Sequence, residues 1–419
     1  MNTATEVTIV GAGPYGLSIA AHLRQMNVNF RIIGSPMHTW RTHMPKGMHL
    51  KSAGLSATLF DPERSFTLKQ YCRQNDIPYE DEGLPISLEL FTQYGMAFQQ
   101  RFAPNLEEAK LQSLRKQGEM FELVLDNGLK FMSRKVILAV GIDYFRYLPQ
   151  PLDGLEKSHY SHSAEHHELE KFRDKEVVVI GSGSSAIDMA VLLHEVKARP
   201  ILVARRQALN FGQKEGRVRT RLSRFVAPMS GLGPGWKNLF CASLPGLFRY
   251  LPSNFRIKVV KEFLGPSGGW FIKPRMKDIP ILLGHKLLSA TSAHGKAELR
   301  FIDVNGELRN IHVDHVIAAT GYKAQVNTIS FLNPELELAI QLVGKTPRLS
   351  ASFESSVPGL YFAGPSTANT FGPVMRFALG AGFASRTISR HLQRVLRQYP
   401  ADGQDLPVRQ SIATSQYQR

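Results

Sequence analysis

Cysteine is nearly absent from this sequence of 419 residues, which holds only Cys72 and Cys241. Two cysteines are too few for a disulfide framework or a four-thiolate metal site, and no Cys-x-x-Cys pair is present for dithiol redox chemistry. Long apolar runs are absent too, since none reaches the roughly 20 residues that a membrane-spanning helix needs. The chain opens with a short polar stretch before a strand-like run, so we expect no signal peptide and a cytoplasmic protein.

Acidic residues are scarce in one part of the chain. The net charge is +16, and residues 197–277 hold 17 Lys and Arg against two Glu, so the remainder is close to neutral. We expect this basic region to meet an anion: a cofactor phosphate, an anionic or acyl-bearing substrate, or a lipid surface. Apolar residues are mixed into it, so peripheral membrane contact is one alternative, but we favour a substrate cap with a solvated basic face. No nucleic-acid-binding motif accompanies the charge.

Two segments have the pattern of strand, glycine turn and helix. The first is VTIV at residues 7–10, GAGPYG at 11–16 and LSIAAHL at 17–23; the second is EVVVI at 176–180, GSGSSA at 181–186 and IDMAVLL at 187–193. In a dinucleotide-binding loop the first glycine makes a tight turn, the second lets the backbone approach the pyrophosphate, and the third lets the helix pack on the strand. Gly11, Gly13 and Gly16 fit these roles, and Ala186 takes the third place in the second loop. Two such loops predict two dinucleotide sites.

The repetition of this unit indicates how the chain is divided. Apolar residues make up 43% and charged residues 21%, as in globular proteins, and the length is about three times that of a typical domain. We predict an α/β fold with two Rossmann-like dinucleotide-binding domains, one inserted in the other. The first would cover residues 1–149 and 314–400, closed by a helical region at 376–396. The second would cover 150–313, with a basic apolar insertion at about 205–285, and residues 401–419 would form a mobile tail.

The end of each second strand indicates which nucleotide is bound. Arg205 and Arg206 follow the strand predicted at residues 200–204 and suit a 2′-phosphate, which favours NADPH over NADH at the second loop. The strand predicted at residues 30–33 is not followed by the acid expected for a ribose hydroxyl. Gly34 stands in that place, so Ser35 or backbone groups would hold the ribose.

With both loops in this order and an Ala-Thr-Gly exit at residues 319–321, the chain resembles the class B flavin monooxygenases, specifically a bacterial branch of FAD/NAD(P)-binding oxidoreductases. The superfamily includes flavin-containing monooxygenases, Baeyer–Villiger monooxygenases and ornithine/lysine N-hydroxylases. The resemblance spans roughly residues 5–395 and implies FAD at the first loop and NADPH at the second, so that the NADPH domain is inserted in the FAD domain. It also implies that reduced flavin and O2 form a C4a-(hydro)peroxide, which transfers one oxygen atom to a small-molecule substrate.

The resemblance implies the site residues as well. Residues 40–62 are similar to the segment beside the isoalloxazine ring, which makes His49, Lys51 and Ser52 the candidate catalytic residues. Of the family's FxGxxxH signature only His162 is kept, and residues 370–376 are expected to open a helix whose N-terminus faces the flavin. The expected cofactor-binding residues are Gly11, Gly13, Pro14, Tyr15, Gly16, Ser35, Trp40, Arg41, Gly181, Gly183, Ser184, Ser185, Arg205, Arg206, Thr320, Gly321, Gly364, Phe371 and Gly372.

Several alternatives stay open. Oxygen could go to nitrogen, sulfur or carbon, or into a ketone by Baeyer–Villiger insertion. The protein could instead be an NAD(P)H-dependent flavin reductase or dehydrogenase without oxygen insertion, because the missing cysteine pair excludes only a dithiol form, or a non-catalytic nucleotide sensor. We expect no metal, since no Cys or acid completes a site with His162, His166 and His167. Residues 265–269 match GxSxG, but no helical pattern follows them, so hydrolase chemistry is not expected.

Overall fold

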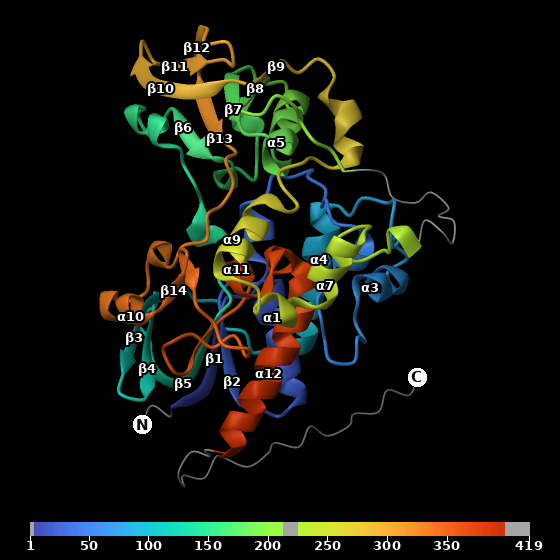
Figure 1. Cartoon of the computed structure of the whole chain (residues 1–419), viewed down its shortest axis with the longest axis vertical. Helices are drawn as coiled ribbons and strands as arrows, with labels where there is room; N and C mark the ends of the chain where they lie inside the picture. The colour runs from blue at the N-terminus through green and yellow to red at the C-terminus, as the bar shows by residue number, and fades with distance from the viewer. Residues whose placement is uncertain (1–3, 213–224, 399–419) are drawn as a thin grey trace, which may run out of the picture.

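The computed structural model describes residues 4–212 and 225–398. Figure 1 shows two lobes, with the first glycine loop in the lower lobe and the second in the upper one. The tail predicted at residues 401–419 lies outside the described residues, as does the part of the basic insertion at 213–224. Within the described residues, no helix is both long and apolar enough to cross a membrane.

The lower lobe is built on a six-stranded sheet in the order β2-β1-β5-β4-β3, with β16 also paired to β5. Its strands are β1 (Thr5–Val10), β2 (Phe30–Ile33), β3 (Leu111–Gln117), β4 (Met120–Leu125), β5 (Lys130–Leu138) and β16 (Leu360–Phe362). Strands β1, β2, β16 and the end of β5 run parallel, whereas β3 and β4 extend the sheet in antiparallel fashion from the start of β5. The parallel segments are mostly buried, which accounts for their apolar runs.

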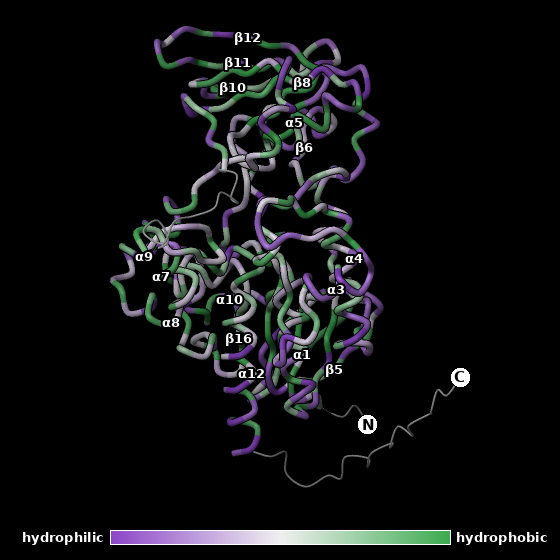
Figure 2. Tube along the Cα trace, turned by 90° about the vertical axis from the view of Figure 1, so that its right-hand side faces the viewer, coloured by the Kyte–Doolittle hydropathy of each residue, from purple (hydrophilic) through white to green (hydrophobic). Residues whose placement is uncertain are grey.

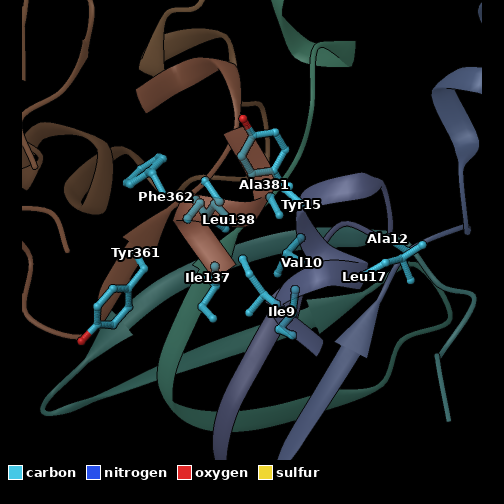
Figure 3. Packing of buried hydrophobic residues seen from close by; sticks show 14 of the residues in the cluster. Ile9, Val10, Ala12, Tyr15, Leu17, Ile137, Leu138, Tyr361, Phe362 and Ala381 are labelled. Atoms are coloured by element: carbon cyan, nitrogen blue, oxygen red, sulfur yellow. The ribbon is translucent and has the colours of Figure 1, made fainter. Parts of the chain in front are cut away.

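Helices cover this sheet and bring distant segments together. Helix α1 follows the first glycine loop and packs against α12, whose Ala384, Ile388, Leu392 and Leu396 form one buried stripe. Figure 3 shows side chains of β1, β5 and β16 packed together in the same core. The helices of this lobe are α1 (Pro14–Gln25), α2 (His38–Thr42), α3 (Leu68–Gln74), α4 (Leu88–Phe102), α10 (Pro334–Ala339), α11 (Ala368–Phe371) and α12 (Ala381–Gln398), with a small ribbon of β14 (Leu342–Val343) and β15 (Thr346–Pro347).

The upper lobe holds a five-stranded parallel sheet in the order β6-β13-β7-β8-β9, and a three-stranded antiparallel sheet beside it. Helix α5 leaves the second glycine loop and packs on β8. The strands are β6 (Tyr160–His162), β7 (Glu176–Ile180), β8 (Arg199–Ala204), β9 (Ile281–Leu283), β10 (Lys286–Ala293), β11 (Lys296–Ile302), β12 (Leu308–Val313) and β13 (His315–Ala318), and the helix is α5 (Ser184–Glu195). The prediction of an α/β fold with two Rossmann-like lobes is thus confirmed.

The domain boundary predicted at residue 314 needs correction. Strand β13 lies just after that boundary, yet it pairs in parallel with β6 and β7 of the upper sheet, with Ile317 opposite Val179. The small-residue exit at 316–321 therefore belongs to the second dinucleotide unit, and the chain returns to the lower lobe only after β13.

The basic insertion also departs from expectation, because its helices pack on the lower lobe. Helices α8 and α9 contact α11, and the Arg256 guanidinium donates to the Asn369 carbonyl oxygen at 2.8 Å. These helices are α7 (Trp236–Ser243), α8 (Pro245–Phe248) and α9 (Ser253–Glu262).

The helix expected to open at residues 370–376 is a further correction. That stretch contains the end of α11, Gly372 and a four-residue 3₁₀ turn, and the long helix α12 begins only at Ala381. No long helix therefore starts there to place a dipole at a flavin. The 3₁₀ turns of the chain are η1 (Gly54–Ser56), η2 (Asp143–Phe145), η3 (Gln150–Gly154), η4 (Ser163–Glu165), η5 (Glu170–Phe172), η6 (Trp270–Met276), η7 (Val326–Thr328), η8 (Pro365–Thr367), η9 (Pro373–Arg376) and η10 (Ala378–Gly380).

Gly13 and Gly16, the second and third glycines of the first loop, differ in how closely other atoms approach them. A Cβ atom on Gly16 would lie 1.8 Å from the Gly11 carbonyl oxygen, so α1 can approach β1 only with glycine there. Gly13 precedes α1 with φ −86° and ψ −170°, which any residue can adopt, and a Cβ atom on it would meet nothing within 4 Å.

We therefore expect Gly16→Ala and Gly13→Ala to differ sharply in stability. Gly16→Ala should lower the free energy of unfolding by about 2 kcal/mol or more, because α1 is forced away from the turn. Gly13→Ala should leave it unchanged or raise it by up to about 1 kcal/mol. Urea unfolding followed by circular dichroism measures both, and an equal loss in the two variants would contradict the packing argument.

Candidate functional site

A cavity of about 1050 Å³ is lined by both lobes. The first glycine loop supplies residues 11–15, helix α5 supplies Ser184 and Ser185, and the basic insertion supplies residues 264–267. This volume is at the upper end of the range for cofactor and ligand pockets. The first glycine loop and the start of α5, directly after Gly183, therefore face one shared space.

The first loop forms a cradle that a side chain would fill. Gly11 has φ +110°, and a Cβ atom on it would lie 2.3 Å from the carbonyl oxygen of Ala139, at the exit of β5. Gly13 leaves open space on the cavity side of the α1 N-terminus. Free backbone N–H groups at the N-terminus of this 12-residue helix favour a phosphate group.

The second loop repeats this geometry in the upper lobe. Gly181 has φ +156°, and a Cβ atom on it would lie 2.3 Å from the carbonyl oxygen of Ala319, at the exit of β13. Gly183 precedes α5 with φ −95° and ψ −176°, much as Gly13 precedes α1. The turn at residues 265–267 lies close to this loop, since a Cβ atom on Gly183 would contact Pro266 at 3.4 Å.

Tyr15 ties the first loop to a distant part of the chain. Its hydroxyl group donates toward the carbonyl oxygens of Met375 and Phe377, each 3.0 Å away, and burial raises its pKa well above the usual range. Part of the residue also lines the cavity, and Figure 3 shows its ring above the core strands. Tyr15 therefore fixes residues 375–377 beside the cradle.

The other predicted cofactor residues divide into two groups. Ser35 and Trp40 line the cavity, and Trp40 packs edge-to-face on Phe91 with ring centroids 4.8 Å apart. Thr320 and Gly321 line it as well, with the Thr320 hydroxyl donating to the Tyr147 carbonyl oxygen. The predicted residues outside the cavity lining are Gly16, Arg41, Gly181, Gly183, Arg205, Arg206, Gly364, Phe371 and Gly372.

Three of the predicted residues outside the cavity lining shape the chain around the cavity. Phe371 is buried and stacks on Phe353 with ring centroids 3.9 Å apart, so it belongs to the core. Gly364 and Gly372 have φ +83° and +91°, a conformation that favours glycine. They turn the chain around η8 and η9, which place Pro365 and Arg376 in the cavity wall.

The three candidate catalytic residues, His49, Lys51 and Ser52, all line the cavity. Burial, reinforced by the charge of Arg275, lowers the pKa of half-buried His49, and its Nδ1 atom has no hydrogen-bond partner. The Lys51 ammonium group contacts the Ser267 hydroxyl of the insertion, and burial lowers its pKa.

Asp188 is a site residue that the sequence analysis missed. Its side chain lies in the cavity wall with the residue only 2% exposed, and the Ser184 hydroxyl donates to its carboxyl group at 3.1 Å. Burial raises its pKa to about 7, although Ser184, Arg275 and Lys51 favour the ionised form. The available signal was a single acid inside the otherwise apolar run at residues 186–193.

Arg376 is the second missed residue. Its guanidinium group lines the cavity and donates to the carbonyl oxygens of Val260, Phe263 and Leu264 at 2.9–3.1 Å. It thereby caps the C-terminus of α9, where a positive charge is favourable. Burial lowers the pKa of Arg376, and its Nε atom has no partner.

The histidines considered for a metal make separate contacts. His162 Nε2 lies 3.1 Å from the Gly321 carbonyl oxygen, His167 Nδ1 lies 2.6 Å from that of Met44, and His166 shares the Ser161 hydroxyl with His315.

A different group does converge in the cavity wall. The ligand atoms of His38, His43 and Asp143 lie within 4.8 Å of one another. Hydrogen bonds already engage all three: His43 Nε2 lies 3.2 Å from the Arg146 guanidinium, Asp143 accepts from Thr39 at 2.8 Å, and His38 Nδ1 lies 3.5 Å from the Thr42 hydroxyl.

Known proteins resemble this chain in sequence. The profile of the pyridine nucleotide-disulphide oxidoreductase family matches residues 8–227, slightly more than half of the chain. An uncharacterized oxidoreductase CzcO-like of Geobacillus kaustophilus is 26% identical over 46% of this chain and 53% of that protein. Ferredoxin–NADP reductase 1 of Bacillus mycoides is 23% identical over 86% of this chain and 81% of that protein. The chain thus spans about half the length of several curated relatives it matches.

A solved structure extends the likeness to the whole architecture. The ornithine N-hydroxylase of Kutzneria sp. 744, determined with reduced FAD, NADP⁺ and L-ornithine, has a TM-score of 0.74 and 13% sequence identity. The match covers 94% of this chain and 100% of that one. At this identity the likeness shows the fold alone.

The raised pKa of Asp188 predicts a pH-dependent stability. The folded protein holds the Asp188 proton up to about pH 7, whereas an unfolded chain releases it near 3.8, so folding takes up a proton between these values. The free energy of unfolding should therefore fall as pH rises through this window, by at most about 4 kcal/mol, and level off above it. Asp188→Asn should remove this part of the dependence in urea unfolding at several pH values.

Ser184→Ala is the matched variant for this experiment. It removes the hydrogen bond that favours the ionised carboxyl, so the stability of the variant should continue to fall to a higher pH than that of the wild type. A difference between wild type and Asp188→Asn that is the same at every pH would contradict the assignment.

Proposed function

Because the chain belongs to the pyridine nucleotide-disulphide oxidoreductase family, we propose that it is an FAD- and NADPH-dependent flavoprotein monooxygenase that inserts one oxygen atom from O2 into a small-molecule substrate. The observation that carries the proposal is the shared cavity, which is lined by the first glycine loop and by Ser184 and Ser185, directly after the second. Two dinucleotides bound at these two loops would bring their reactive rings toward this one cavity. Family membership makes the protein an oxidoreductase, and we propose that its reaction inserts oxygen into the substrate.

The residues of the first loop fit FAD. Gly13 leaves room for a pyrophosphate at the N-terminus of α1. An acid for the ribose hydroxyl would not fit at Gly34, which has φ +140° and whose Cβ atom would lie 3.2 Å from the Ala12 nitrogen. Ser35 follows directly and lines the cavity, so it is the residue we assign to the ribose.

The residues around the second loop fit NADPH. Gly181 and Gly183 form the same kind of turn before α5 as the first loop forms before α1. Arg205 and Arg206 are exposed immediately after β8, where the 2′-phosphate of NADPH would lie in a Rossmann-like fold. A carbon on Gly265 would lie 3.6 Å from the Arg206 guanidinium, so this side chain lies next to the turn at 265–267.

Bound FAD would accept a hydride from NADPH and activate O2, and the chain's residues would control the space around it. The surface of the cavity wall is mostly apolar, which disfavours water beside a bound ring. His49 is neutral at pH 7, because its pKa is lowered, and its free Nδ1 atom can hold or accept a proton. Lys51, held by Ser267, supplies positive charge, and Asp188 can donate or accept a proton near neutral pH.

A reductase function without oxygen insertion is the second candidate. The ferredoxin–NADP reductase relative, matched over most of both chains, favours it. An internal dithiol mechanism does not fit this chain, because Cys72 and Cys241 are both buried, free and distant in sequence. A reductase of this kind would pass its electrons to an external acceptor.

The fate of O2 separates the two candidates. With NADPH, isotopically labelled O2 and a panel of amines, sulfides and ketones, we expect at least one compound to accelerate NADPH consumption by about tenfold or more. Its product should carry one labelled oxygen atom, detected by mass spectrometry. NADPH consumption that yields only hydrogen peroxide, or that depends on added ferredoxin or quinone, would support the reductase instead.

The two arginines after β8 should set the choice of nucleotide. Arg205→Ala with Arg206→Ala should raise the KM for NADPH by about tenfold to a hundredfold and leave that for NADH nearly unchanged, since hydrogen bonds between charged groups contribute about 1.5–3 kcal/mol. Steady-state oxidation of each nucleotide measures this. Arg309→Ala on β12 is the control for a lost exposed cation. Equal effects on both nucleotides would contradict the assignment.

A further inference from the structure

Exposed apolar side chains gather on the helices of the basic insertion. Sixteen large apolar side chains of the described residues are exposed, and half of them lie between residues 225 and 255. These eight are Phe225, Val226, Trp236, Phe240, Leu244, Leu247, Tyr250 and Phe255, which we call the apolar face. Single exposed apolar residues are ordinary, but a concentration of this kind marks an interaction surface.

Part of the apolar face spans neighbouring elements. Trp236 and Phe240 lie one turn apart on α7, and the Trp236 ring is 6.4 Å from that of Phe225. Helix α8 contacts α7; Leu244 directly precedes α8 and Leu247 lies within it. Figure 2 shows α7, α8 and α9 together on one side of the molecule, opposite α3 and α4 in that view.

The helices that carry the apolar face are firmly attached to the lower lobe. Phe248 of α8 is buried against Gly372, and Arg256 of α9 donates to the Asn369 carbonyl oxygen. Arg376 caps the far end of α9. The inner sides of these helices are thus packed, while the apolar face stays open on a folded support.

The charge around the apolar face points to an anionic occupant. Residues 225–262, up to the end of α9, contain five cations and one acid, Glu262. Lys237, Lys258 and Lys261 are exposed, and Arg249 lies beside Tyr250, with its guanidinium 5.3 Å from the ring. A second copy of the chain, docked through the same face, would oppose these cations to each other. Aromatic and aliphatic side chains flanked by Lys and Arg match the interface of an anionic bilayer.

We propose that the apolar face docks on the surface of an anionic lipid membrane. Aromatic and aliphatic side chains of α7 and α8 enter the headgroup region, and the flanking cations meet lipid phosphates. Val260, Lys261 and Leu264, at the C-terminal end of α9, also line the cavity, so docking places one wall of the cavity near the lipid surface. This inference rests on the surface alone and stands whether or not the proposed reaction is correct.

Vesicle flotation of the full-length protein tests the proposal. Vesicles of phosphatidylcholine alone are compared with vesicles that contain about 30% phosphatidylglycerol, at low and at about 1 M salt. We expect binding to the anionic vesicles at low salt, and at least tenfold less binding to the neutral ones. Absence of binding to anionic vesicles, or equal binding to both kinds, overturns the proposal.

Two pairs of variants separate the apolar and the charged contributions. Leu247→Ser with Tyr250→Ser should reduce the bound fraction about tenfold while keeping every cation of the chain, which excludes mere attraction by its net charge. Leu338→Ser, at a residue 86% exposed on α10, is the matched control and should bind as the wild type does. Lys237→Glu with Lys258→Glu should reduce binding, whereas Arg309→Glu on β12 should not.

Folding and self-association are checked on the same samples. Circular dichroism and bound flavin should be equal in all variants, so a loss of binding reports on the surface. Sedimentation velocity shows whether the protein associates through this face. If Leu247→Ser with Tyr250→Ser abolishes a dimer and leaves vesicle binding unchanged, the face belongs to a second copy and the lipid proposal is overturned; binding lost to the same degree in the Leu338→Ser control overturns it as well.

Discussion

Both lobes depend on the same close contact between a glycine and a backbone carbonyl group. Gly11 faces the Ala139 carbonyl oxygen and Gly181 faces that of Ala319, at a distance that leaves no room for a Cβ atom. Each glycine N–H group also donates to the end of the next strand, Gly11 to Ile33 at 2.8 Å and Gly181 to the equivalent residue of β8 at 3.0 Å. Each glycine turn therefore lies very close to two strands. As a result, the helix that follows it starts at the edge of the sheet and presents its N-terminus to the cavity.

The two glycine loops can share one reaction space only if the region between them is covered. The basic insertion covers it from the lower lobe, although the sequence analysis placed this insertion in the second domain. Its helices pack on the lower lobe, where Arg256 and Arg376 bond to carbonyl oxygens across the junction. Its turn at residues 265–267 lies beside Gly183, and Ser267 meets Lys51. Contacts with both lobes let one segment of the chain bridge the two cradles.

Local sequence was enough to predict the glycine loops, their flanking strands and the two-lobed α/β architecture, because each depends on residues close together in the chain. It was not enough where the contact is distant. Strand β13 was assigned to the wrong lobe, because its pairing with β6 and β7 joins residues about 155 and 140 positions apart, respectively. Asp188 and Arg376 acquire their places in the site from burial and from partners such as Val260, which no local pattern specifies.

The net charge of a segment likewise does not predict which partners its charged side chains bind. The sequence analysis expects the cations of residues 197–277 to meet one anionic partner. In the structure, the described cations make contacts at several separate places. Arg275 forms a two-pronged ion pair with Glu195 at 2.8–2.9 Å, and Arg256 bonds to a carbonyl oxygen. Arg205 and Arg206 lie at the end of β8, while Lys237 and Lys258 remain on the open side of the helices. Cations used for internal bonding are unavailable to ligands. Among the described residues, Arg205 and Arg206 are free for the proposed cofactor phosphate, whereas Lys237 and Lys258 lie at a separate place, beside the proposed lipid surface.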